Sequence, residues 1–96
     1  MSAFIIADIS IKNEAAYREY IAAITPSVQA YDGQYKIRGG APEALRGEWQ
    51  SERIVMMEFP NRERAKQWLN ADSLAAIHQQ REDNAHYCHM ILCDSV

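Results

Sequence analysis

The segments of this chain that are rich in strand-forming residues are apolar on both faces. In residues 3–11, AFIIADISI, Ile5, Ile9 and Ile11 alternate on one side, whereas Phe4 and Ile6 point to the other. Residues 52–59 and 86–93 repeat this double pattern. An antiparallel strand that faces water carries polar residues on its wet side. The chain is therefore expected to build a sheet that is covered on both sides.

Helical patterns separate these strands. Between Asn13, a helix-capping residue, and the stop signal Asp32-Gly33, apolar residues recur at spacings of three and four. The members of this stripe are Tyr17, Tyr20, Ile21, Ile24, Val28 and Tyr31. Pro26 interrupts it, and Thr25 before it predicts a fresh N-cap with a kink or restart of the helix. A second helical region starts at Asn61 and is expected to break near Asp72-Ser73.

With a short strand at residues 34–38 and a loop running to about Trp49, the order is β-α-β-β-α-β. This order predicts an α+β, ferredoxin-like fold, with a four-stranded antiparallel sheet and two helices on one face. The 96 residues are expected to form a single domain, 1–96.

Two helices cover only one face of such a sheet. The opposite face measures roughly 350 Å², and covering about 400 Å² of apolar surface contributes about 10 kcal/mol before association costs. We therefore expect a second copy to supply the cover as a homodimer, sheet against sheet.

Charge and patterning narrow the class of partner. The formal charge of −3 argues against a nucleic-acid-binding protein. The N-terminal MSAFIIADIS has no basic region, and no apolar run reaches membrane-spanning length, so a cytoplasmic protein without membrane attachment is expected. Cys88 and Cys93 lie five residues apart on one predicted strand, hence on opposite faces, and are expected to be free thiols.

Charged residues interrupt the apolar pattern of the uncovered face. Strand parity places several of them there: Asp8, Lys36, Arg38, Glu52 and Glu58. Tyr35 and Ile37 would then face the helices, and His89 would join the charged group if Cys88 faces the helices. Charges in a buried interface must be paired or must meet a ligand, so a site is expected on this face.

Several stretches resemble one known family. They are FIIADISIKNEAAYREY, TPSVQAYDGQYKIRGG, RGEW, RIVMMEFP and IHQQR, and they resemble the domain-of-unknown-function 1330 (DUF1330) family of the dimeric α/β-barrel superfamily nearly from end to end. The most specific piece is Tyr35-x-x-Arg38-Gly39-Gly40. The resemblance implies a ferredoxin-like subunit that dimerises through its sheet into an α/β barrel. It implies no particular reaction.

Arg38 with Gly39 and Gly40 admits two interpretations. One is an anion clamp, in which the guanidinium and glycine amides bind a carboxylate, with Arg81 closing the entrance of the pocket. The other is a turn that needs positive φ, with Arg38 paired to Asp8 or Glu58 and Arg81 only complementing a helix dipole. Both remain open at this stage.

Three functions are compatible with these residues. The first is binding of a small anionic or aromatic metabolite near Arg38, with Asp8 and Glu58 as further ligand-binding candidates. The second is a cofactor-free oxygenase or isomerase, as found elsewhere in the superfamily, with Asp8, Glu58 or His89 as the acid or base. The third is a dimerisation module without ligand. No metal or cofactor is expected, because His78, His86 and His89 lack metal-ligand spacing.

Overall fold

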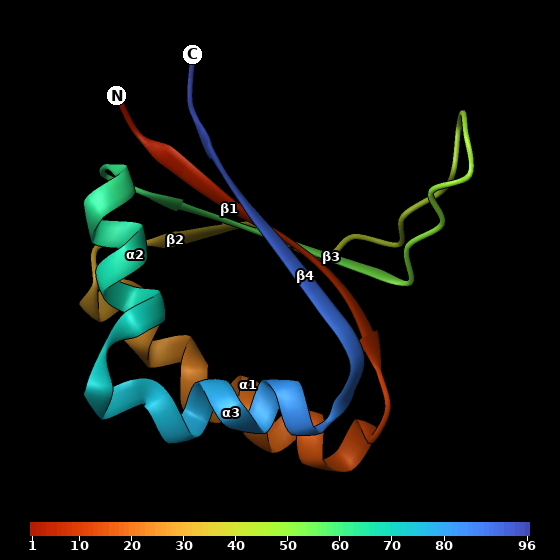
Figure 1. Cartoon of the computed structure of the whole chain (residues 1–96), viewed down its shortest axis with the longest axis horizontal. Coiled ribbons are helices and arrows are strands. Elements are labelled where there is room, and N and C mark those ends of the chain that lie inside the picture. The colour runs from red at the N-terminus through yellow and green to blue at the C-terminus, as the bar shows by residue number, and fades with distance from the viewer.

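The computed structural model describes residues 1–96 and shows a four-stranded antiparallel sheet with all helices on one side (Figure 1). The elements, in chain order, are β1 (Ala3–Ile11), α1 (Glu14–Ala30), β2 (Gln34–Gly39), β3 (Arg53–Phe59), α2 (Arg62–Asn70), a 3₁₀ turn η1 (Asp72–Leu74), α3 (Ala75–Asp83) and β4 (Ala85–Asp94). The strand order is β2-β3-β1-β4. The ferredoxin-like prediction is confirmed, including the break of the second helical region.

The helix starts are the ones that the sequence predicted. Asn13 accepts a hydrogen bond from the backbone N–H of Ala16 at 3.1 Å, and Asn61 accepts one from Arg64 at 2.8 Å. Each side chain thus satisfies a backbone donor that the first helical turn leaves free.

The prediction of a fresh N-cap at Thr25 is wrong. Helix α1 runs through Pro26 without interruption, and the Thr25 hydroxyl donates to the Ile21 carbonyl at 2.6 Å. A hydroxyl inside a helix commonly bonds back to the preceding turn in this way. Burial of Ile24 and Val28 on either side of Pro26 stabilises the continuous helix, although the proline lacks an N–H.

The core lies between the helices and the inner face of the sheet, the face that carries Ile5, Ala7 and Ile9. Trp68 is 1% exposed, and its indole N–H donates to Ser27 at 2.9 Å. The ring centroids of Trp68 and Phe59 are 5.6 Å apart. This packing fixes α2 and α1 against the sheet.

A β-bulge in β2 exchanges the faces of its last residues. Tyr35 pairs with Met57, but Ile37 pairs with Met56 and Arg38 with Val55. The extra residue breaks the period of two, so every side chain after it changes side. The prediction that Ile37 faces the helices and Arg38 faces away is therefore wrong. Ile37 lies on the outer face, the side of the sheet away from the helices, and Arg38 lies on the inner side.

The outer face carries an apolar row across all four strands. The cross-strand register aligns Ile37, Met56, Ile6 and Ile91. Ile91 is 60% exposed. The loop between β2 and β3 projects away from the sheet (Figure 1), and its Leu45 and Trp49 are 90% and 64% exposed. None of the helices is both long and apolar enough to cross a membrane.

Candidate functional site

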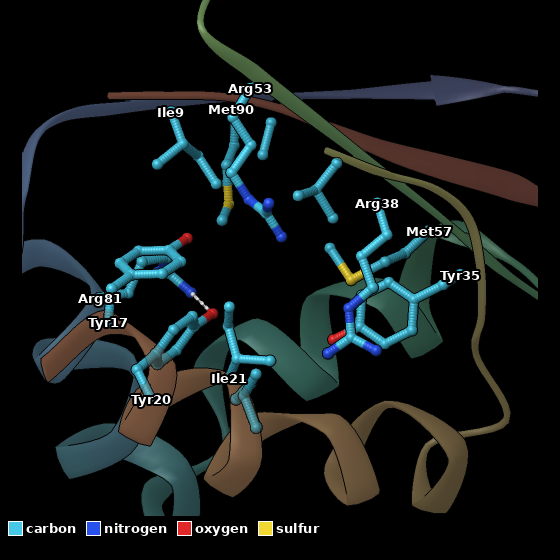
Figure 2. Close-up of a pocket in the computed structure, with 13 residues that line it drawn as sticks. Ile9, Tyr17, Tyr20, Ile21, Tyr35, Arg38, Arg53, Met57, Arg81 and Met90 are labelled. Atoms are coloured by element: carbon cyan, nitrogen blue, oxygen red, sulfur yellow. Dashed lines mark hydrogen bonds between the residues drawn. The ribbon is translucent and has the colours of Figure 1, made fainter. Parts of the chain in front are cut away.

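A narrow cavity lies between the inner face of the sheet and helices α1 and α3 (Figure 2). Its polar lining consists of three arginines and three tyrosines: Arg38, Arg53, Arg81, Tyr17, Tyr20 and Tyr35. The remaining lining residues are aliphatic or methionine. The free volume is about 20 Å³, which is room for one or two water molecules.

Arg53 projects into this cavity from the start of β3. It shares strand parity with Val55, Met57 and Phe59, all of which are buried on the inner face. Its Nε is buried without a hydrogen-bond partner, and no ion pair of the structure includes it. Its nearest aromatic partner is Tyr17, with 6.0 Å between the guanidinium carbon and the ring centroid. Arg53 as a whole is half-buried, and a polar atom shielded from water without a partner is costly, so this position favours a bound anion.

The sequence interpretation missed Arg53, although a signal was present. An arginine at position 53 continues the odd-numbered, helix-facing series of β3. A charged residue at the end of an otherwise apolar, inward-facing series is the signal from which Arg53 could have been predicted to face the core.

Arg81 forms the opposite wall and is held from several sides. It is 5% exposed, and its Nη1 donates to the Tyr20 hydroxyl at 3.3 Å (Figure 2) and to Nδ1 of His78 at 2.8 Å. Its Nε donates to Glu82 at 2.8 Å. Because Nδ1 of His78 accepts from Arg81, the ring proton sits on Nε2, which donates to the Trp68 carbonyl at 3.0 Å. Arg81 therefore lies in the cavity wall rather than at the entrance.

The tyrosines facing the cavity retain their protons at neutral pH. Burial raises the pKa of Tyr17 and of Tyr20 above the ordinary value. The Tyr20 oxygen already accepts from Arg81, which leaves its O–H free to donate into the cavity. The arginines and these protonated hydroxyls can thus all donate hydrogen bonds into the cavity.

Arg38 lies at the exposed margin of the same cavity. Its guanidinium donates to the Thr25 hydroxyl and lies over the Tyr35 ring, 4.2 Å from the centroid. It does not pair with Asp8 or Glu58, which removes that part of the turn interpretation. Gly39 and Gly40 have φ angles of 98° and 70°, so the chain needs glycines here as that interpretation expected.

The acidic candidates lie on the outer face, across the sheet from Arg38. Asp8 accepts hydrogen bonds from Trp49 Nε1 at 2.8 Å and from the Ser51 hydroxyl at 2.5 Å. Glu58 accepts from the Ser2 hydroxyl at 2.6 Å and lies 3.4 Å from Lys36 Nζ. The Ser2 hydroxyl and the Lys36 ammonium lower the pKa of the Glu58 carboxyl. Both carboxylates therefore have protein partners.

His89 belongs to this outer group. It is the cross-strand neighbour of Asp8, and its ring stacks on Tyr87 with centroids 5.0 Å apart. The structure thus brings Asp8 and His89 to neighbouring positions. On the inner side of the sheet, Arg38 and Arg81 line the cavity with Arg53, and Gly39 lies next to Arg53. Nowhere do three or more His, Cys, Asp or Glu side chains group in a way that could hold a metal ion.

Comparisons with known proteins agree with this architecture. The model of the family described as "Domain of unknown function (DUF1330)" matches residues 2–96. A comparison of the sequence with curated proteins finds no match.

Solved structures resemble the chain at low sequence identity. A protein of unknown function from Rhodopseudomonas palustris superposes with a TM-score of 0.83 at 11% identity, covering 99% of this chain and 82% of that one. A dimeric ferredoxin-like protein of unknown function from Thermobifida fusca gives 0.67 at 8% identity, covering 99% and 92%. A protein from Caulobacter crescentus, suggested to be an antibiotic biosynthesis monooxygenase, gives 0.70 at 11% identity, covering 99% and 90%. At such identities the likeness shows a common fold.

Proposed function

Because this chain belongs to the DUF1330 family, whose description assigns no reaction, we propose a function from its own cavity: the domain binds a small anionic or aromatic metabolite beside Arg38. The observation that carries this proposal is the Arg53 guanidinium, which points into the cavity with a buried Nε that no protein group satisfies.

The charge balance of the cavity supports an anion. Three arginines line it, and no aspartate or glutamate does. Like charges around a partly buried space repel each other more strongly than they do in water, and a bound anion offsets this repulsion. Arg81 has the exposed Glu82 as a partner outside the cavity, whereas Arg53 has none. Arg38, which is exposed, is free to move aside and admit the ligand.

We also propose that two copies pair through the outer face. The row of Ile37, Met56, Ile6 and Ile91 supplies an apolar strip across the whole sheet. The similar Thermobifida fusca protein is described as dimeric. A cytoplasmic location forms part of the same proposal, because Cys88 and Cys93 are free and thiols stay reduced in that compartment.

A cofactor-free enzyme of the oxygenase or isomerase type is the second candidate. The observation that favours it is the pair of buried hydroxyls of Tyr17 and Tyr20 facing the same cavity as the arginines. Such hydroxyls donate to an oxyanion as it develops on a substrate. A dimerisation module without ligand is the third candidate, and the absence of any anion effect would favour it.

A thermal-shift experiment tests the binding proposal. Acetate, benzoate and phosphate are each titrated against the wild-type protein, the R53M variant and a matched R62M control. Arg62 is a good control because it forms an exposed pair with Asp94, away from the cavity. At least one anion is expected to raise the melting temperature of the wild type and of R62M by mass action, but not that of R53M. Equal shifts in all three proteins, or none in the wild type, would overturn the proposal.

A further inference from the structure

We infer that the ligand is a small monocarboxylate with an apolar body, which deepens the proposed function and rests on it. Three features of the cavity point to this ligand: the kind of polar group that reaches it, the chemistry of its remaining wall, and its width.

The polar groups of the cavity are rich in hydrogen-bond donors: three guanidinium groups, which only donate, and three tyrosine hydroxyls, which can donate, without any carboxylate. Arg53 presents a guanidinium whose Nε is unpartnered, and Tyr20, whose oxygen accepts from Arg81, keeps an O–H that can donate. The Tyr17 hydroxyl faces the same space (Figure 2). The complement of such a donor-rich, positively charged set is an anionic group that accepts hydrogen bonds. A guanidinium fork matches the two oxygens of a carboxylate in a planar, bidentate arrangement.

The remaining wall limits the charge of the ligand. Aliphatic and thioether side chains surround the donors, among them Ile9, Ile24, Val55 and Met90. A phosphate dianion would have to leave its hydration shell against these apolar groups with too few donors to replace it. A carboxylate concentrates one charge at one end of the molecule and leaves the other end apolar. The wall therefore favours an amphipathic monoanion.

The width of the cavity limits the size of the ligand and indicates how it enters. Only about 20 Å³ is free, so side chains must move when a ligand binds. The movable ones are Met57 and Met90, which are unbranched, and Arg38 at the margin. After the body has entered, Arg38 can return to its place over Tyr35 and close the cavity.

Isothermal titration calorimetry with a matched set of probes tests this inference. Benzoate carries both the charge and the apolar body, benzamide keeps the shape without the charge, acetate keeps the charge without the body, and phosphate is a hydrophilic anion. Benzoate is expected to bind at least about tenfold more tightly than each of the other three. Y17F is expected to weaken the binding of benzoate by about tenfold, because the carboxylate loses one hydrogen-bond donor. R53M is expected to abolish benzoate binding, and R53K to restore it in part.

The outcomes separate this inference from the proposed function. If phosphate binds more tightly than benzoate and R53M removes the phosphate, the anion site stands and the monocarboxylate inference fails. If benzamide binds as tightly as benzoate, the carboxylate is not the recognised group and the inference fails. If no anion binds to wild type or R62M, both fail. Circular dichroism checks that each variant is folded. If R53M does not fold, R53K is the variant that tests the role of Arg53.

Discussion

Gly39 and Arg53 meet across neighbouring strands: a Cβ built on Gly39 would stand 3.1 Å from Nη1 of Arg53. The glycine has φ of 98°, which L side chains rarely adopt. One residue of the Arg-Gly-Gly stretch thus provides both the turn at the end of β2 and the room for the guanidinium. The family stretch and the cavity are parts of the same arrangement.

Substitution G39A is expected to reduce both stability and anion binding. The positive φ costs an alanine about 1–3 kcal/mol, and the added methyl crowds the Arg53 guanidinium, which must shift by a few tenths of an ångström. The substitution G47A is the matched control, because Gly47 has φ of 80° but nothing within 4 Å of a built Cβ. Chemical denaturation should show a loss of stability in both variants, and benzoate titration a loss in G39A alone. Normal benzoate binding by G39A would contradict this role.

Substitution R53M is expected to stabilise the ligand-free protein. Arg53 is half-buried and its Nε has no partner, so replacing it by an apolar side chain of similar size removes the penalty of an unsatisfied polar atom, about 1 kcal/mol. Urea unfolding in a non-binding buffer measures the difference.

Substitution R81M provides the contrast. It leaves the Nδ1 acceptor of buried His78 without its donor, and an unsatisfied buried acceptor is destabilising by about 1–3 kcal/mol. A loss of stability in R53M as large as that in R81M would mean that Arg53 is structural.

The stability of the protein is expected to fall as the pH drops below about 6.5, the ordinary value for histidine. Burial lowers the pKa of His78 in the folded state, and its Nδ1 is occupied by Arg81. The unfolded chain therefore takes up a proton at a higher pH than the folded protein. The stabilising contribution is complete above the unfolded pKa and is lost as the pH falls through the folded pKa.

Urea unfolding of the wild type and of H78Q between about pH 8 and pH 5 checks this expectation. This range includes the ordinary pKa of histidine and stays above most carboxyl pKa values. The wild type should lose more stability than H78Q across the range. The charged groups near the ring are Arg81 and Glu82, so an E82Q variant measures the contribution of that carboxylate. Equal pH dependence in the wild type and H78Q would show that His78 is not the titrating group.

Substitution I91D is expected to convert the proposed dimer to a monomer. Ile91 is 60% exposed in the single chain and stands at the end of the outer apolar row, so the fold tolerates the change. An unpaired charge in an interface costs about 3 kcal/mol or more, hence a roughly hundredfold weaker dimer.

Light scattering at micromolar concentration measures the mass of both proteins. A76D is the control, since Ala76 is an exposed residue of α3 on the helical side. A monomeric wild type, or an I91D variant that remains dimeric, would contradict pairing through the outer face.

Local patterns were sufficient for the elements and for the layers. The caps at Asn13 and Asn61 act within one helical turn, and the alternation in β1 depends only on neighbouring residues. Features of this kind can be predicted from the chain because their causes lie a few residues away. The double apolar pattern likewise predicted the row that contains Ile6 and Ile91.

The sequence expected the candidate residues together, and the structure divides them between the two sides of the sheet. Arg38 and Arg81 lie in the wall of the cavity, whereas Asp8, Glu58 and His89 lie across the sheet. Strand parity assigned Arg38 to the wrong face, because a single extra residue in β2 moves every later side chain to the opposite face of the sheet. Whether a strand bulges depends on its pairing with the neighbour, and that information is absent from the strand itself.

The sequence alone thus determined the order of elements, the helix starts and the apolar character of both sheet faces, since each depends on short-range patterns. The meeting of Arg53, Arg81 and Tyr20 was decided only in the folded molecule. These residues come from β3, α3 and α1, and nothing in their spacing along the chain relates them. Packing of the helices on a bulged, twisted sheet places their donors around one space, and no local rule contains that geometry.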